Sequence, residues 1–264
     1  MNKQKTEAYT LHKPKKAVPL VMDSPHSSPV FPNDFNAALP LDDLRDGEDV
    51  FIDALWAHAP DHGAHLLLAE FARTYIDPNR HVGDVDLAMI EGEWPHAYEP
   101  SGKAQIGKSL IWRTLDDGRP IYNRKLSVDE VHQRIQRYAL PYQAQLQNLI
   151  DEHHQQFGVC YHINCHSMNA VSGKMGEGGA GIARADVVLG DRDGTTCSAR
   201  IIGIQAFIQL NLQAVFSLRR VRECSHQFNT FEGVVDFDVI AALLHEIFHQ
   251  MCELGRAGGA IAVA

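Results

Sequence analysis

The sequence predicts an α/β fold, and three observations carry that prediction. Two short apolar segments, residues 18–22 and 159–163, each run into a polar stretch that contains a His-Ser pair, as buried strands do where they end. A long segment between them, residues 127–150, has its apolar residues at helical spacing. The chain has 264 residues, of which 45% are hydrophobic, and this is enough to bury the core of one large domain.

The first half of the chain supplies two strands and one helical segment. Residues 1–16 are polar and rich in lysine, and we expect a flexible tail. Residues 18–22 form the first strand, residues 41–62 have mostly helical spacing with Pro60 near their end, and residues 65–69 form the second strand. Residues 81–125 show little periodicity of their apolar residues, which predicts a long irregular segment.

The second half starts with a long helix. Ser127 and Glu130 form a capping box at its beginning, and Pro141 predicts a kink or a split. The strand that starts at Val159 should run into a loop near His166, and residues 185–190 predict a further strand. Residues 199–218 and 237–254 look helical. We expect a tail (1–16), an α/β domain (17–198) and a mainly helical remainder of the same domain (199–264).

Charge and composition argue against several classes of partner. The net charge of −9 leaves no basic surplus for a nucleic-acid backbone. No apolar run is long enough to span a bilayer, and no apolar segment follows the basic N-terminus as in a secretory signal. Five cysteines without a Cys-x-x-Cys motif favour a reducing, cytoplasmic location over a disulfide framework.

His26 and His166 are the first candidates for chemistry. Both follow predicted strands, and ligands of open α/β sheets bind beyond the carboxyl ends of strands. Two imidazoles, one carboxylate and an open position are typical of a catalytic zinc site. The nearest acids lie in the segment Arg45-Asp46-Gly47-Glu48-Asp49, although a predicted helix start by itself explains acids there better. The alternative is that each histidine makes only local hydrogen bonds.

A second group consists of arginines and an asparagine. Arg73, Asn79 and Arg80 gather after the second strand, where guanidinium groups and an amide could clamp a carboxylate. Arg113, in the irregular segment, is a weaker candidate of the same kind. Solvated arginines beside Asp77 are the alternative interpretation.

The segment His245-Glu246-Ile247-Phe248-His249 matches the H-E-x-x-H pattern of zinc peptidases. It lies on an apparent helix close to the end of the sequence, and only Cys252 and Glu253 follow as further ligands. A chance match in a histidine-rich chain is the competing explanation.

Taken together, these motifs resemble those of the N-formylglutamate amidohydrolases, which are relatives of zinc carboxypeptidases and succinylglutamate desuccinylases. The order and spacing of six segments between Pro19 and Ser198 carry the resemblance. They are Asp23-Ser24-Pro25-His26-Ser27, Glu48-Asp49 with Asp53-Ala54-Leu55, Arg73 with Ile76-Asp77-Pro78-Asn79-Arg80, Ile111-Trp112-Arg113, Cys165-His166-Ser167-Met168 and Ala185-Asp186-Val187-Val188-Leu189-Gly190-Asp191.

The resemblance implies a three-layer α/β/α fold around a mixed, mostly parallel sheet, as in zinc exopeptidases. It also implies one zinc ion per chain, held by His26, His166 and Asp49, with Glu48 as the alternative acid. The implied substrate is a small anionic N-acyl amino acid, above all N-formylglutamate in histidine degradation. Arg80 and Asn79 would hold its α-carboxylate, with help from Arg73 or Arg113.

The chain departs from the family pattern in three places. Asn164 stands where the family often has aspartate, two residues before the second histidine, and Gln143 stands where histidine is expected. The resemblance fades after Ser198, and the expected glutamate base is not visible, so Glu246 is the remaining candidate for that role. The hypotheses are therefore a zinc amidohydrolase, an H-E-x-x-H peptidase, or a catalytically impaired relative that binds partners or self-associates as a homo-oligomer.

Overall fold

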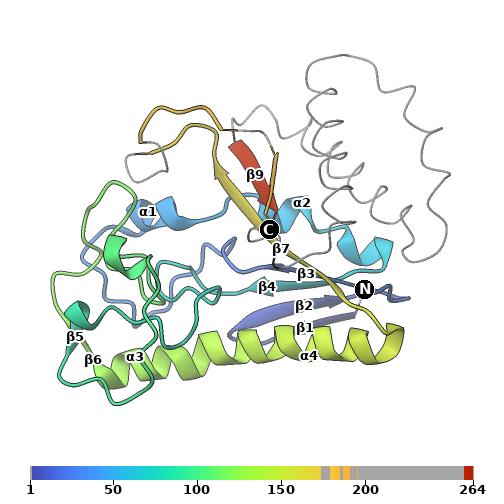
Figure 1. Ribbon diagram of the computed structural model, residues 1–264, viewed down its shortest axis with the longest axis horizontal. Coiled ribbons are helices and arrows are strands. Elements are labelled where there is room, and N and C mark those ends of the chain that lie inside the picture. The colour runs from blue at the N-terminus through green and yellow to red at the C-terminus, as the bar shows by residue number, and fades with distance from the viewer. Residues whose placement is uncertain (1, 174–178, 185–186, 191–194, 196–258, 264) are drawn as a thin grey trace.

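A mixed sheet of seven strands lies at the centre of the part of the chain that the structure describes (Figure 1). The computed structural model describes residues 2–173, 179–184, 187–190, 195 and 259–263. The strand order is β1-β2-β4-β3-β7-β9-β8. The strands are β1 (Asn2–Lys5), β2 (Tyr9–Lys13), β3 (Leu20–Ser24), β4 (His65–Ala69), β7 (Tyr161–Asn169), β8 (Val187–Leu189) and β9 (Gly259–Val263), and a separate small sheet pairs β5 (Ile90–Glu91) with β6 (Leu126–Ser127).

The middle of the sheet is parallel, whereas its flanks contain antiparallel pairs. β3 runs parallel to both of its neighbours, β4 and β7, and β8 runs parallel to β9. The pairs β1–β2, β2–β4 and β7–β9 are antiparallel. The sheet is mixed, as expected, but the expected predominance of parallel pairs is not found among the described strands. One reason is that a short turn joins β1 to β2, and such a turn permits only antiparallel pairing.

Residues 2–5 and 9–13 form strands, although a flexible tail was expected for residues 1–16. β1 and β2 form a hairpin that extends the sheet, and β2 pairs with β4 so that Leu11 lies opposite Leu67. Leu11 is fully buried. A strand this short has little stability alone and becomes ordered by pairing with its neighbour, so its few apolar residues gave no clear signal in the sequence.

The two faces of the sheet bury two separate cores. Leu20 and Met22 of β3 pack with Ile52 and Trp56 in one core, while Val21, which points to the other face, joins the core beneath the long helix. Figure 1 shows α4 running along one side of the sheet and α1 and α2 on the opposite side. The helices are α1 (Leu41–Leu44), α2 (Ile52–Leu55), α3 (Val128–Arg134) and α4 (Leu140–Phe157).

Residues 41–62 do not form one helix. Between and after α1 and α2 lie 3-10 turns at Arg45–Gly47 and Ala59–His62, and Phe51 adopts a left-handed conformation with φ of 68°. A Cβ atom on Gly47 would lie only 2.6 Å from the Thr74 methyl group, so this turn packs tightly. The interruption leaves Asp49 outside any helix, where its backbone N–H donates to the carbonyl of His26 (3.0 Å).

The long helix begins as predicted but contains a wide turn. Ser127 caps α3 by accepting a hydrogen bond from the backbone N–H of Glu130 (3.1 Å). A π-helical turn, Ile135–Ala139, joins α3 to α4 immediately before Pro141. Because proline lacks an N–H, the regular hydrogen-bond pattern cannot continue through it. The predicted irregularity at Pro141 thus takes the form of this π-turn.

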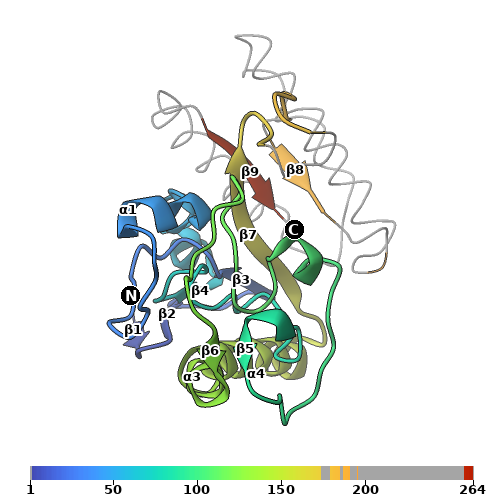
Figure 2. The ribbon, with the colours of Figure 1, turned by 90° about the vertical axis from the view of Figure 1, so that its left-hand side faces the viewer.

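His166 lies within a strand and not in the loop that the sequence predicts. β7 continues to Asn169, and His166 pairs with Ala262 of β9. Figure 2 shows β7 extending past β3 and β4, with β9 and β8 beside its far end. The pairing of β3 with β7 ends at Asp23 and Asn164, so His166 still stands beyond the carboxyl end of β3.

Residues 81–125 are irregular, as expected, apart from β5 and 3-10 turns at Leu87–Met89 and Ala104–Ile106. The helices predicted at residues 199–218 and 237–254, together with the H-E-x-x-H segment, lie outside the described residues. In the described part of the chain, no helix is both long and apolar enough to cross a membrane.

A partly buried histidine pair between β4 and α4 predicts a loss of stability in acid. The Nδ1 atom of His65 lies 3.1 Å from Nε2 of His153, whose own Nδ1–H donates to the Leu149 carbonyl. Burial, His153 and Lys13 together lower the pKa of His65 from 6.5 to about 4. His65 therefore takes up a proton at a higher pH in the unfolded chain than in the folded protein. The contribution of the pair to the free energy of unfolding is lost as the pH falls from about 6.5 to about 4.

We expect this loss to amount to about 1–2 kcal/mol, because His65 is partly exposed and water weakens the effect. Urea unfolding at pH 7 and pH 5 measures it, with His65→Asn as the comparison, since an asparagine amide can donate to His153 without titrating. Identical pH dependence in the two proteins would show that the pair is not responsible.

Candidate metal centre

Three residues that lie far apart in the sequence bring their ligand atoms together at the carboxyl end of β3. Nδ1 of His26 lies 3.1 Å from Nδ1 of His166. Oδ2 of Asp49 lies 2.8 Å from Nδ1 of His166 and 3.4 Å from Nδ1 of His26. Two imidazole nitrogens and one carboxylate oxygen thus face a common point. His26 and Asp49 are buried and His166 is half-buried.

The spacing of these three atoms fits a tetrahedral metal ion. Zinc binds imidazole nitrogen and carboxylate oxygen at about 2.0–2.1 Å, so two ligand atoms of a tetrahedral site lie roughly 3.3 Å apart. The three observed separations, 2.8–3.4 Å, surround that value. The donor set and its geometry therefore suit a zinc ion with one position left open.

Different elements deliver the three ligands. His26 follows β3 directly, His166 lies in β7, the parallel neighbour of β3, and Asp49 lies in the interrupted segment between α1 and α2. The hydrogen bond from the Asp49 N–H to the His26 carbonyl ties the third segment to the first. Glu48, the alternative acid, instead pairs with Arg45 through both carboxylate oxygens (2.7 and 3.1 Å). Of the two acids, the structure brings Asp49 to the histidines.

Asp77 supports the site, although no motif in the sequence assigns it a role of its own. Its Oδ1 accepts a hydrogen bond from Nε2–H of His26 (2.7 Å), and its side chain is completely buried. A carboxylate in this position fixes the orientation of the imidazole and leaves the Nδ1 lone pair directed at the metal position. The sequence signal was only an acid next to the residues Pro78-Asn79-Arg80, which does not distinguish a buried carboxylate from a solvated one.

The charged groups of the site stabilise one another. Burial alone would raise the pKa of Asp49, but hydrogen bonds from His166 and His26 and the charge of Arg73 hold it well below its usual range. Burial likewise opposes ionisation of Asp77, and the charges of His26 and Arg73 outweigh it. Burial lowers the pKa of His166, which favours a neutral imidazole able to bind metal. Burial and Arg73 also act to lower the pKa of His26, yet Asp77 and Asp49 raise it overall.

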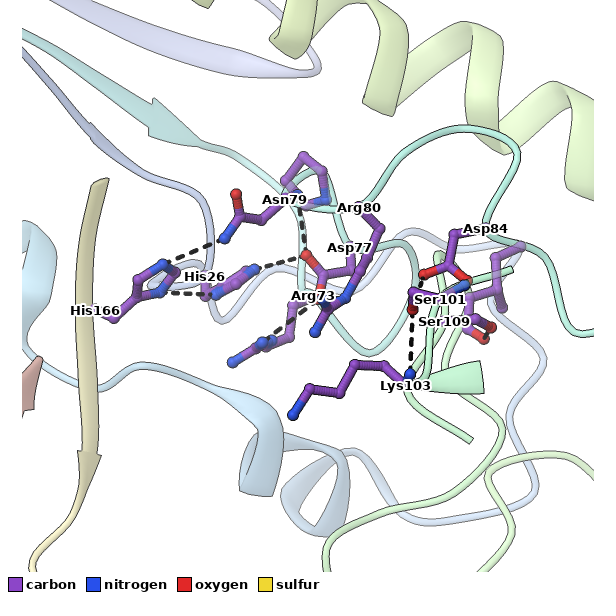
Figure 3. Close-up of polar contacts among 12 residues, drawn as sticks. His26, Arg73, Asp77, Asn79, Arg80, Asp84, Ser101, Lys103, Ser109 and His166 are labelled. Atoms are coloured by element: carbon purple, nitrogen blue, oxygen red, sulfur yellow. Dashed lines mark hydrogen bonds and ion pairs between the residues drawn. The ribbon is translucent and has the colours of Figure 1, made fainter. Parts of the chain in front are cut away.

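A group of basic side chains lines the site on the side of Asp77 (Figure 3). Arg73 bridges the two buried acids, at 3.2 Å from Asp49 and 3.4 Å from Asp77, and its guanidinium group stacks on Trp112. Nε of Arg80 lies 3.8 Å from Asp77. Within the described residues, the buried Nε atoms of both arginines have no hydrogen-bond partner. The site therefore contains cationic N–H groups whose hydrogen-bonding capacity the described residues leave unused.

Two expected site residues have other surroundings. Arg113 pairs with Asp86 (2.7 Å) on the irregular segment, and its side chain is partly exposed. Asn79 turns its amide toward His166.

Figure 3 shows a residue that the sequence did not indicate, Lys103, extending its side chain in the direction of Arg73 and Arg80. Glu246, the expected catalytic residue, lies outside the described residues, as do His245 and His249.

Comparisons with known proteins agree with this geometry. The sequence profile of the N-formylglutamate amidohydrolase family matches residues 18–220. The crystal structure of N-formylglutamate amidohydrolase from Ralstonia eutropha JMP134 is 42% identical, with a TM-score of 0.72 over 80% of this chain and 75% of that one. The gene product Atu2144 from Agrobacterium tumefaciens is 17% identical, with a TM-score of 0.53 over 71% of this chain and 65% of that one, and supports the fold alone. A comparison with curated proteins gave no match.

Proposed function

Because this chain belongs to the N-formylglutamate amidohydrolase family, we propose that it hydrolyses the amide bond of an N-acyl amino acid. The first candidate is N-formyl-L-glutamate, with formate and L-glutamate as the products. The observation that carries this proposal is the convergence of His26, Asp49 and His166 on one point beside a cluster of arginines. We propose one zinc ion at that point.

Zinc held by these residues would supply Lewis acidity, which polarises a carbonyl group and acidifies water. The protein's own side chains then have two tasks. Asp77 and Arg73 keep the ligands in place, the former through His26 and the latter through Asp49. The arginines bind the carboxylates of the substrate, so that the formyl group lies over the three ligand atoms.

The charges of the site suit a substrate with two carboxylates. The buried charges of Asp49 and Asp77 are balanced by those of Arg73 and Arg80. A divalent ion adds two positive charges in a place shielded from water, and a dianion such as N-formylglutamate would neutralise them. Lys103 extends toward the same region and is a further candidate for the second carboxylate.

We propose Glu246, the candidate from the sequence, as the group that exchanges protons with water and with the leaving amine. It lies outside the described residues. We also propose that the enzyme acts in the cytoplasm, in the degradation of an amino acid such as histidine.

The experiment that tests the function is hydrolysis of a matched set of substrates. Purified protein is incubated with N-formyl-L-glutamate, N-acetyl-L-glutamate and N-formyl-L-norleucine, each with added zinc and with a chelator, and the released amine is measured. We expect hydrolysis that needs zinc and that is at least about tenfold slower with the neutral side chain of norleucine, because the buried cations then lack a partner. No amine release from any of these compounds would contradict the proposal.

A further inference from the structure

A glutamine of the long helix holds the turn Pro78-Asn79-Arg80 from one side. Nε2 of Gln143, in the first turn of α4, donates to the backbone carbonyls of Pro78 (3.0 Å) and Arg80 (2.8 Å). Because a carbonyl oxygen can only accept, both contacts require the nitrogen of the amide, which fixes the orientation of the Gln143 side chain. One side chain thus uses both of its N–H groups on the two residues that flank Asn79.

Asp77 holds the same turn from its other end. Its Oδ1 accepts a hydrogen bond from the backbone N–H of Asn79 (3.0 Å), and its backbone carbonyl accepts one from the N–H of Arg80 (3.1 Å). The same Oδ1 accepts from His26 (2.7 Å). Figure 3 shows Asn79 and Arg80 directly beside Asp77. Asp77 therefore serves both the metal site and the turn, whereas both hydrogen bonds of the Gln143 nitrogen go to the turn.

The rotation of α4 that brings Gln143 to this turn depends on the π-turn Ile135–Ala139. Arg134, just before the π-turn, donates to the Tyr75 carbonyl (3.1 Å), so the helices contact the segment 75–80 from both sides of the π-turn. In a regular α-helix, residues nine positions apart, as 134 and 143 are, point in roughly opposite directions, because each residue turns by about 100°. A π-turn accommodates one extra residue, which brings the two side chains to within about a quarter of a turn of each other.

The first turn of α4 is also fixed against the sheet. The hydroxyl group of Tyr142, the residue before Gln143, donates to Asp23 of β3 (2.7 Å), and both side chains are buried. π-turns within helices are rare and often occur at functional sites. The irregular turn and the Tyr142 contact together give Gln143 a defined position, from which it determines where the backbone of Pro78 and Arg80 lies.

We propose that Gln143 is a positioning residue for substrate binding, which holds the Pro78-Asn79-Arg80 turn so that Asn79 and Arg80 meet the α-carboxylate of the substrate. The inference rests on the proposed function and on the assignment of Asn79 and Arg80 that the family resemblance implies. Gln143 acts through two backbone carbonyls and does not contact the candidate ligands through them. Its replacement should therefore weaken substrate binding and spare the metal.

The first test is the steady-state kinetics of two variants with N-formyl-L-glutamate. Gln143→Met keeps the length of the side chain but has no N–H, and we expect KM to rise about tenfold, as for the loss of two hydrogen bonds that fix a binding group. We expect kcat to stay within about twofold and the zinc dissociation constant to stay unchanged. Gln143→His keeps an N–H for one carbonyl at most from each ring nitrogen, so its KM should lie between those of the wild type and Gln143→Met.

Gln147→Met is the matched control. Gln147 lies one turn further along α4, is exposed, and donates to Asp151 (2.9 Å). The same substitution there should leave KM unchanged. Equal KM values in Gln143→Met and Gln147→Met would overturn the inference. A zinc dissociation constant that rises in Gln143→Met as much as KM does would also overturn it, because Gln143 would then act on the metal through Asp77.

Hydrogen exchange supplies a readout that needs no turnover. In the zinc-loaded protein without substrate, we expect the backbone amides of Asn79 and Arg80 to exchange faster in Gln143→Met than in Gln147→Met, because the turn has lost its contact with α4. Equal exchange in the two variants would refute the positioning role, whatever the protein hydrolyses. Faster exchange in Gln143→Met, with no hydrolysis by the wild type, would contradict the proposed function and support the hold of Gln143 on the turn.

Discussion

Replacing His166 with alanine is expected to abolish tight zinc binding and to reduce hydrolysis to the background level. The substitution leaves His26 and Asp49 as the remaining protein ligands of the three that converge at 2.8–3.4 Å. Removal of a partner in the outer shell of a metal site costs about 10–100-fold in affinity, and loss of a direct ligand should cost more. Metal content after gel filtration and a chelator-competition assay measure the first effect, and amine release measures the second.

Two other histidines make this experiment decisive. His58 pairs with Asp61 at the surface, and His58→Ala should leave both zinc content and activity unchanged. His245→Ala tests the H-E-x-x-H hypothesis. If zinc is lost from His245→Ala and kept in His166→Ala, the protein is a zinc peptidase of that type. If the wild-type protein binds zinc through His166 but hydrolyses no N-acyl amino acid, a binding protein derived from the family is the better description.

Replacing Arg134 with methionine is expected to lower the free energy of unfolding by about 3–5 kcal/mol, as is typical when a buried charge network is broken. The side chain is 1% exposed. It donates to the backbone carbonyls of Tyr75 and Phe35 and to the hydroxyl of Tyr122. Methionine fills much of the space but leaves the two carbonyls without a donor. Urea unfolding should show the loss, and the melting temperature should fall by roughly 10 °C.

Arg137→Met, in the adjacent π-turn, is the matched control. Arg137 is about half exposed and pairs with Glu7 and Asp34 at the surface. Ion pairs of this kind contribute less than about 1 kcal/mol, so this variant should unfold close to the wild type. Equal losses in the two variants would mean that burial of Arg134 is not what makes it important.

The stability prediction also concerns the metal site. The guanidinium group of Arg134 holds the Tyr75 carbonyl, two residues before Asp77. Asp77 fixes His26, and the next residues carry Asn79 and Arg80. Zinc affinity measured in Arg134→Met below its unfolding transition should therefore be lower than in Arg137→Met.

The sequence by itself determined the parts of this protein that depend on local pattern. A short continuous apolar run specifies β4, and the Ser127–Glu130 pair specifies the start of α3, because these signals act between residues that are close in the chain. His26, Asp49 and His166 could be selected as one set because the order of short motifs resembles a known family. Their selection did not require the distances between them.

Only the tertiary structure decided which groups complete the site. Burial of Asp77 and Asp23, the choice of Asp49 over Glu48, and the contact of Asn79 with His166 all join residues that the linear sequence does not show to be in contact. The same holds for β2, whose few apolar residues become a strand through pairing with β4. The physical reason is common to all of them: the charge, proton position and order of a side chain depend on the partners that surround it after folding.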